Sequence, residues 1–201
     1  MSSHTRRLLG GSDMHLDANR INSRQKIPAV NRLEEWGRDG VIYLTICERA
    51  QQEAAHGHDA CRRAKAMGQP TWLTLANTPE ELAFMQRIEK AVFPNGATEP
   101  SQRNDVEILF CARKYHAILV TNDGGSKSQP QGILGSRAAL AELGIKVMTA
   151  EEAVARVIYL LLHRDRNAID CWKVIGEPLP DWVGQDAPEI ADEIQRYRDA
   201  E

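Results

Sequence analysis

The sequence contains no long apolar segment. Its longest uninterrupted apolar run covers residues 157–162, whereas a membrane-spanning helix needs about 20 apolar residues. The first residues, MSSHTRRLLGGSD, are polar and lack the apolar centre of a secretory signal. We therefore expect a cytoplasmic protein that is neither secreted nor inserted into a membrane.

Cysteine and positive charge are also scarce. The chain has four cysteines, with no C-x-x-C pair and no histidines at zinc-finger spacing, which argues against a zinc site and for reduced thiols. The formal net charge is -3. Because the chain has no overall basic field, any contact with nucleic acid must come from local basic patches.

Several phosphate-binding motifs are absent. Residues 125–128 read Gly-Ser-Lys-Ser and lack the glycine that precedes the lysine of a P-loop, and no dinucleotide-binding fingerprint is present. An aspartyl-phosphate phosphatase is expected to carry its general acid at position 19, where this chain has Asn19. The sequence therefore disfavours these three classes of protein.

What the sequence does contain is an alternation of short apolar strands and amphipathic helices. With 201 residues and 42% apolar content, the chain can build one good-sized core and an appendage. Strands are predicted at 14–18, 41–46, 117–120 and 145–148, and helices at 27–39, 47–54, 79–92, 104–115, 133–143, 150–163 and 188–199. This alternation predicts an α/β fold with a mostly parallel sheet of four or five strands.

The predicted units follow from the same pattern. Residues 1–13 are expected to form a mobile N-terminal tail, residues 14–163 a single domain, and residues 164–201 a C-terminal extension with a terminal helix. Residues 94–102, rich in Pro, Gly and Ser, are expected to form a loop.

Four acidic residues are predicted to lie at one edge of the sheet. Asp17, Glu48 and Asp123 each follow a strand, and Asp105 opens the helix that leads back into the third strand. Ligands of open α/β sheets bind outside the carboxyl ends of the strands. Taken singly, each acid is also explained by a turn or by the first turn of a helix, so the argument depends on their joint placement.

Clustered carboxylates raise one another's pKa and need a compensating positive charge. A hard divalent cation such as Mg²⁺ prefers oxygen ligands and is typically held by one or two carboxylates plus a substrate phosphate. Such an ion can activate water and neutralise charge on a phosphoryl oxygen. The four acids therefore point to hydrolysis of a phosphodiester.

The residues also resemble a known family. Asp17-Ala18-Asn19, a strand running into Glu48, Asp105 with Ile108 and Ala112, and the segment at 119–123 (Leu-Val-Thr-Asn-Asp) are similar to the PIN domain, a metal-dependent ribonuclease fold. The resemblance covers residues 14–163 and implies a three-layer α/β/α sandwich.

In that family the four acids bind Mg²⁺ or Mn²⁺, and Thr121, with Asn19, would support the metal shell. The family often has another acid shortly after the last one, where this chain has Gly124, Gly125 and Ser126, so one or two metal ions remain open.

The implied function is an endoribonuclease acting on single-stranded RNA, since RNA bases must be accessible to be distinguished. Four cations near the acids in sequence are candidates for phosphate contacts, with solvated surface as the alternative for each: Arg20, Arg24, Lys26 and Lys127. A second basic cluster, Arg62, Arg63 and Lys65, is expected to be a solvated helix face.

Many small PIN-domain proteins are toxins of bacterial toxin–antitoxin pairs. The resemblance therefore also implies an antitoxin or another protein as a possible partner, and a possible homodimer. The alternative is a PIN-like module without turnover that binds RNA or a protein partner.

Overall fold

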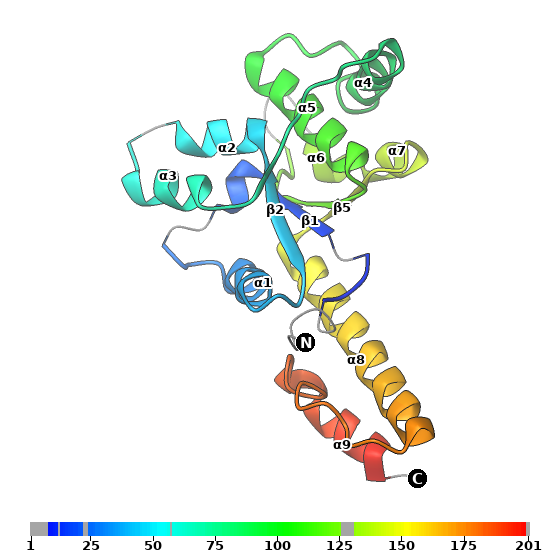
Figure 1. Cartoon of the computed structure of the whole chain (residues 1–201). Helices are drawn as coiled ribbons and strands as arrows, with labels where there is room; N and C mark the ends of the chain where they lie inside the picture. Colours follow the sequence, from blue (N-terminus) through cyan, green and yellow to red (C-terminus); the bar gives the residue numbers. More distant parts are fainter. Residues whose placement is uncertain (1–7, 12, 22–23, 57, 126–130, 200–201) are drawn as a thin grey trace.

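The centre of the protein is a five-stranded, entirely parallel sheet with the strand order β3-β2-β1-β4-β5. The computed structural model describes residues 8–11, 13–21, 24–56, 58–125 and 131–199 (Figure 1). The strands are β1 (Asp13–Leu16), β2 (Tyr43–Cys47), β3 (Thr71–Trp72), β4 (Ile118–Val120) and β5 (Lys146–Met148). Leu16 at the end of β1 pairs with Ile46 of β2 and with Val120 of β4, so these three strands end at the same edge.

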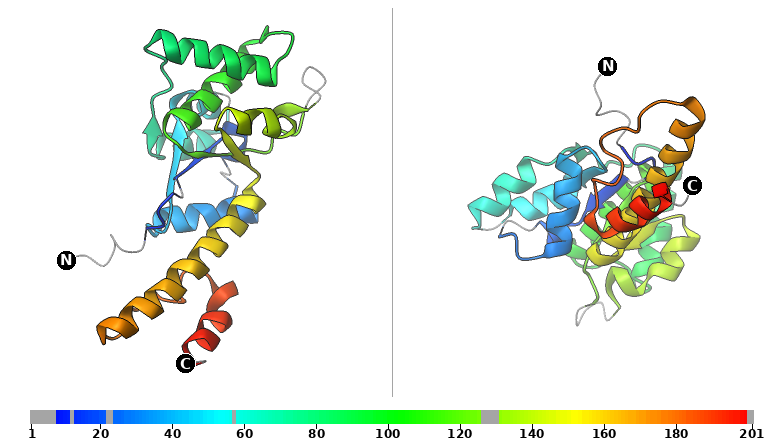
Figure 2. Two further views of the ribbon diagram at one scale, coloured as in Figure 1. Left: turned by 90° about the vertical axis from the view of Figure 1, so that its right-hand side faces the viewer. Right: turned by 90° about the horizontal axis from the view of Figure 1, so that it is seen from below.

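Helices cover both faces of the sheet, which makes the fold the predicted three-layer α/β/α sandwich. One layer holds α1 (Pro28–Arg38), which packs against α8 (Ala150–Ile175). In the other, α5 (Pro100–Lys114) packs on β2 and β4 and contacts α2 (Glu48–Ala55) and α4 (Pro79–Val92) (Figure 2). The remaining helices are α3 (Ala60–Met67), α6 (Gly132–Gly135), α7 (Arg137–Glu142) and α9 (Ala191–Asp199), with short 3-10 turns at Ala18–Arg20 and Pro188–Ile190.

The central strand β1 shows how the two faces are assigned. Successive side chains of a strand point to opposite faces, so His15 and Asp17 share one face. The His15 ring lies 6.3 Å from the ring of Tyr115, at the end of α5, and Tyr115 stacks on Trp72 at 4.6 Å. The α5 layer therefore covers the face to which Asp17 belongs. Burial lowers the pKa of His15 to about 4, which keeps this core imidazole neutral at pH 7.

Helix α5 begins a turn earlier than the sequence analysis predicted. It starts at Pro100, and Glu99 and Gln102 form a capping box that closes its first turn. The predicted loop over residues 94–102 is therefore wrong at its C-terminal end, because a proline is well suited to the first turn of a helix. As a consequence Asp105 lies inside the helix and does not open it.

Three further elements differ from the prediction. The segment at 133–143 forms two short helices, α6 and α7, separated at Ser136, and not one helix. Strand β3 was not predicted, since it has only two residues and a weak pattern. Helix α8 continues to Ile175, well beyond the predicted end at residue 163.

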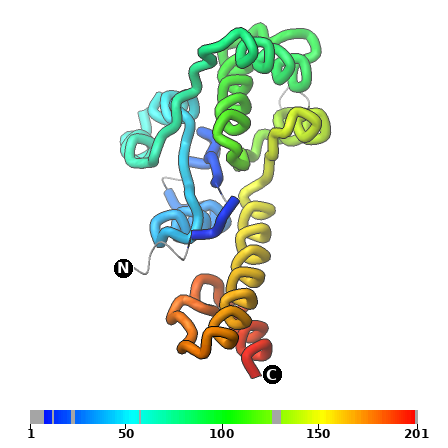
Figure 3. Tube along the Cα trace, turned by 45° about the vertical axis from the view of Figure 1, so that its right-hand side comes forward, coloured from blue at the N-terminus to red at the C-terminus, as the bar shows by residue number. Residues whose placement is uncertain are grey.

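The C-terminal extension folds back along the second half of α8, which projects from the sheet (Figure 3). Arg164 on α8 binds Asp165 at 2.7 Å and Asp186 at 2.8 Å, and the amide of Gly184 donates to Asp165 at 2.8 Å. Trp36 of α1 donates its indole N–H to the carbonyl of Asp186 at 2.7 Å. The buried ion pairs thus hold the extension against α1. Among the described residues, no helix has the length and apolar character needed to cross a bilayer.

The predicted N-terminal tail is anchored at one point. The side chain of Leu9 is buried, and its amide donates to the carbonyl of Val41 at 2.8 Å. This contact holds Leu9 against Val41, whereas the mobility of the predicted tail stays a prediction. Residues 1–7 and 12 lie outside the described chain.

We expect the replacement Asp165→Ala to lower the free energy of unfolding by about 3 kcal/mol, because it removes the buried carboxylate that accepts from both Arg164 and the Gly184 amide. Urea denaturation followed by tryptophan fluorescence measures the change. The control Asp181→Ala removes an exposed aspartate from the same extension and should change stability by less than about 0.5 kcal/mol. Equal stability of the two variants would contradict the anchoring role of the ion pairs.

Candidate functional site

Asp17 is the most buried acid at the carboxyl edge of the sheet and is held by two neighbouring side chains. Because Leu16 and Val120 are paired, the next residues, Asp17 and Thr121, leave β1 and β4 side by side. The Thr121 hydroxyl donates to Asp17 Oδ2 at 2.5 Å, and the Asn19 amide donates to the same oxygen at 2.7 Å. The predicted supporting residues Asn19 and Thr121 therefore do contact Asp17.

Asp123 is fixed by backbone amides. Its own N–H donates to Thr121 Oγ1 at 3.0 Å, and its Oδ2 accepts from the amide of Ile133 at 2.8 Å. Gly132 makes this approach sterically feasible: it has φ +59°, and a Cβ there would lie 2.6 Å from the carbonyl oxygen of Asp123. The start of α6 is thus folded onto Asp123.

Asp105 faces the other two aspartates from α5. Burial, together with the charges of Asp17, Asp123 and Glu53, raises the pKa of Asp105 to about 8. The pKa of Asp17 is raised to about 6, mainly by burial; the Thr121 hydrogen bond opposes this shift, and the charges of Glu53 and Asp123 add to it. The structure therefore brings Asp17, Asp105 and Asp123 into one electrostatically coupled cluster, as the sequence analysis predicted.

Glu53 is the member of the cluster that the sequence analysis missed. It lies on α2, and its Oε1 accepts from the amide of Asn104, next to Asp105, at 2.5 Å. The buried Ala50 lies three positions before Glu53 and so on the same side of α2, but this burial is a property of the fold that the sequence did not signal.

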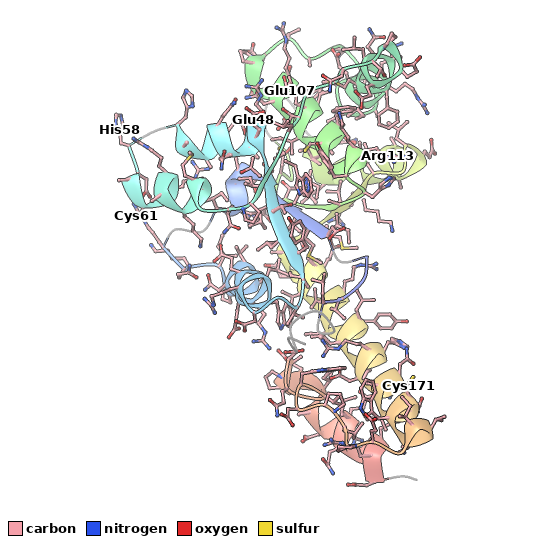
Figure 4. The ribbon with its side chains drawn as sticks, in the orientation of Figure 1. Glu48, His58, Cys61, Glu107, Arg113 and Cys171 are labelled. Atoms are coloured by element: carbon pink, nitrogen blue, oxygen red, sulfur yellow. The ribbon has the colours of Figure 1, made fainter. Side chains whose placement is uncertain are left out.

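Glu48 is the first residue of α2, directly after β2 (Figure 4), but the charges that raise the pKa values of Asp17 and Asp105 are those of Glu53 and the aspartates. A role for Glu48 in the site therefore stays a prediction. Glu48 Oε1 accepts from the side-chain amide of Gln52 at 3.4 Å. The pKa of the neighbouring Arg49 is raised, chiefly by its hydrogen bond to Glu107 and to a smaller extent by the charges of Glu53 and Glu48. Arg49 in turn binds Glu107 of α5 at 2.6 Å. Glu48 thus stands beside an ion pair that ties α2 to α5.

Two guanidinium groups contact the residues that follow Asp17. Arg20 donates to Asn19 Oδ1 at 2.9 Å, and Arg62 of α3 donates to the carbonyl of Ala18 at 2.7 Å. Arg62 is partly buried, and Lys65 binds Glu34 at 2.6 Å. The expectation that this basic cluster is a solvated face is therefore wrong for these two residues, because both side chains reach neighbouring elements.

The other predicted phosphate contacts lie farther out. Arg24 is exposed and lies 3.8 Å from Asp59, and Lys26 is exposed. Lys127 lies outside the described residues. Of the four predicted cations, Arg20 is the one that the structure connects directly to the hydrogen-bond network of Asp17.

The cluster is an oxygen-rich site with a deficit of positive charge. Across the described residues, no group of three or more His, Cys, Asp or Glu side chains lies close enough to ligate one metal ion together. The carboxylates interact through their charges and not through shared contacts. Chemically, the arrangement favours a bound cation, because a positive charge would relieve the repulsion that raises these pKa values.

Comparison with known proteins returned no relative. No protein-family model matches the chain, and neither the curated proteins nor the solved structures contain a match. The case for a function therefore depends on the residues and their geometry.

We expect Asp105→Asn to be more stable than the unmodified protein at pH 8–9 without divalent cations, by about 2 kcal/mol. The pKa of Asp105 is raised in the folded state, so the unfolded chain loses this proton first and stability falls as pH rises from about 4 to about 8. Asparagine removes that dependence. Urea denaturation of both proteins at pH 5 and pH 9 measures it; an unchanged pH slope would show that Asp105 titrates normally.

Proposed function

We propose that the protein is a Mg²⁺- or Mn²⁺-dependent endoribonuclease with a PIN-like active site made by Asp17, Asp105 and Asp123, with Glu48 and Glu53 contributing from α2. The observation that carries this proposal is the convergence of three aspartates from separate segments, two of them with pKa values raised to about 6 and 8. Perturbed carboxylates of this kind concentrate at functional sites.

The residues present fit a hard divalent cation. The donor set consists of carboxylate oxygens supported by a hydroxyl and an amide, without sulfur or imidazole ligands. Mg²⁺ keeps several of its waters and needs only one or two direct carboxylates, so three coupled carboxylates that do not share contacts suit an ion held partly through water. When bound, such an ion lowers the pKa of a water and neutralises charge on the phosphate.

The chain's own residues would orient the reactants. Thr121 and Asn19 hold Asp17 Oδ2 and so fix the orientation of this carboxylate. The Ile133 amide fixes Asp123 in the same way. Carboxylates locked by such hydrogen bonds keep the geometry that a positioned phosphodiester requires.

The surroundings of the cluster support a phosphate-containing substrate. The guanidinium groups of Arg20 and Arg62 donate hydrogen bonds to Asn19 and Ala18, the residues that follow Asp17. They place positive charge at the edge of an otherwise acidic site, where a phosphate could bind. Single-stranded RNA is the substrate that we propose, since its bases are accessible to the protein.

One observation favours the alternative of a PIN-like module without turnover. In the described parts of the chain, no three acidic or other metal-binding side chains are within ligating reach of one point. A binding module would keep the charged edge and the fold but would not cleave RNA.

The proposal is tested by incubating labelled single-stranded RNA with the protein in the presence and absence of Mn²⁺. We expect metal-dependent cleavage that falls by more than about 100-fold in Asp17→Asn and Asp123→Asn, beyond the loss typical of a residue that merely supports a metal ligand.

The matched control is Asp181→Asn, which changes an exposed aspartate of the extension and should cleave like the unmodified protein. Equal activity of all four proteins would remove the assignment of the site. No cleavage by the unmodified protein, combined with RNA binding, would support the binding module.

We further expect Glu53→Gln to weaken Mn²⁺ binding about 10-fold, because Glu53 contributes negative charge at both Asp17 and Asp105. Glu48→Gln is the comparison from the same helix. Isothermal titration with Mn²⁺ measures both. A larger loss in Glu48→Gln would identify Glu48, as the sequence analysis predicted, as the stronger contributor from α2.

A further inference from the structure

A cavity of about 470 Å³ lies where the segment joining α4 to α5 passes over the start of α5. This segment is seen at the top of Figure 1. Its lining combines apolar residues such as Phe93 and Pro94 with polar residues that include Asn95, Gln102, Gln131 and Ser136. The volume is within the range of about 300–1,000 Å³ found for small-ligand sites.

Two elements of the acidic site also line this cavity. Gln102 lies three residues before Asp105 on α5, so the two side chains share a side of the helix. Gln131 and Ser136 flank α6, and the amide of Ile133 in that helix holds Asp123. Helices α5 and α6 therefore each contribute to both the cavity and the carboxylate cluster.

The polar groups in the cavity suit a neutral, planar ligand. Gln102 and Ser136 are buried and are used within the protein: Gln102 Oε1 accepts from the backbone amides of Thr98 and Glu99, and the Ser136 hydroxyl donates to the carbonyl of Gly132. The side-chain amides of Asn95 and Gln131 are exposed and accessible to a ligand. The acidic residue of the lining, Glu99, caps the first turn of α5 and would repel an anion. Amides and hydroxyls beside an aromatic ring are the groups with which proteins read an unstacked base.

A second hollow, of about 230 Å³, continues from the first. It shares Phe93, Pro94 and Gly96 with the larger cavity and is bordered by Lys90. A cation at this place is suited to the backbone phosphate of a neighbouring nucleotide.

We propose that the 470 Å³ cavity binds one unstacked nucleobase of the RNA substrate and sets a base preference near the cleaved bond, with Asn95 and Gln131 as specificity-determining residues. This inference rests on the proposed function, since it assigns the cavity to the substrate of the same site. Pro94, which is exposed beside the buried Phe93, supplies apolar surface for the base, and the side-chain amides of Asn95 and Gln131 contact its edge.

The test is RNA binding without turnover, measured by fluorescence anisotropy in EDTA with labelled single-stranded homopolymers of A, C and U. We expect the unmodified protein to favour one base by about fivefold or more, and the double variant Asn95→Ala/Gln131→Ala to lose that preference, because each amide contributes hydrogen bonds to the base. The matched control, Asn167→Ala/Gln185→Ala, removes an exposed asparagine and an exposed glutamine from the C-terminal extension and should keep the preference.

The outcomes separate the two proposals. Equal binding of all three homopolymers by the unmodified protein, or a preference that survives in the double variant, overturns the base-binding role of the cavity whether or not the protein cleaves RNA. A preference that depends on Asn95 and Gln131 supports the cavity even if cleavage with Mn²⁺ is absent, in which case the nuclease proposal alone fails.

Discussion

Repulsion among carboxylates at the end of the sheet is the constraint on which the rest of the site depends. Asp17, Asp105 and Asp123 are brought together from β1, α5 and β4, and burial removes the water that would otherwise stabilise their charges. The hydrogen bonds from Thr121 and Asn19 to Asp17 offset part of this penalty. The part of this penalty that is not offset raises the pKa values of Asp17 and Asp105. A bound cation would therefore stabilise the cluster.

Helix α5 connects this cluster to the rest of the molecule. At its C-terminal end Tyr115 packs on Trp72 and close to His15, and near its start Asp105 faces the other aspartates. Asp105 and Tyr115 are ten positions apart, which corresponds to about 15 Å along the helix at about 1.5 Å per residue. The same helix carries Gln102 into the cavity that we assign to a nucleobase, so catalysis and base choice would share one rigid element.

In the C-terminal extension, by contrast, acidic side chains are paired with a cation. Its contact with α1 depends on the paired charges of Arg164, Asp165 and Asp186 and on the indole of Trp36. In this network each acid has a cationic partner, whereas the acids at the edge of the sheet mainly have one another. The paired charges of the extension therefore stabilise the fold, whereas repulsion among the acids at the edge of the sheet opposes it.

Part of the fold and of the candidate site could be predicted from the sequence. Asp17 and Asp123 were found because they follow apolar strands, and parallel strands end at a common edge. Asp105 was also predicted to lie at this edge, although its helix begins earlier, at Pro100. The strand that follows α5 ends at the edge, so the helix before it must run away from the edge and its first turns must lie close to it. Glu53 was missed, and so was β3, whose two residues have too little pattern to be recognised.

By itself, the sequence determined the alternation of strands and helices, because local periodicity and capping residues such as Thr149 are properties of short segments. It also determined which acids leave the strands. The tertiary structure alone decided that Glu53 reaches the aspartates, that Arg62 is partly buried against Ala18, and that α8 carries a folded extension. These features depend on contacts between segments far apart in the chain. No local sequence pattern predicts which side chains will be buried together.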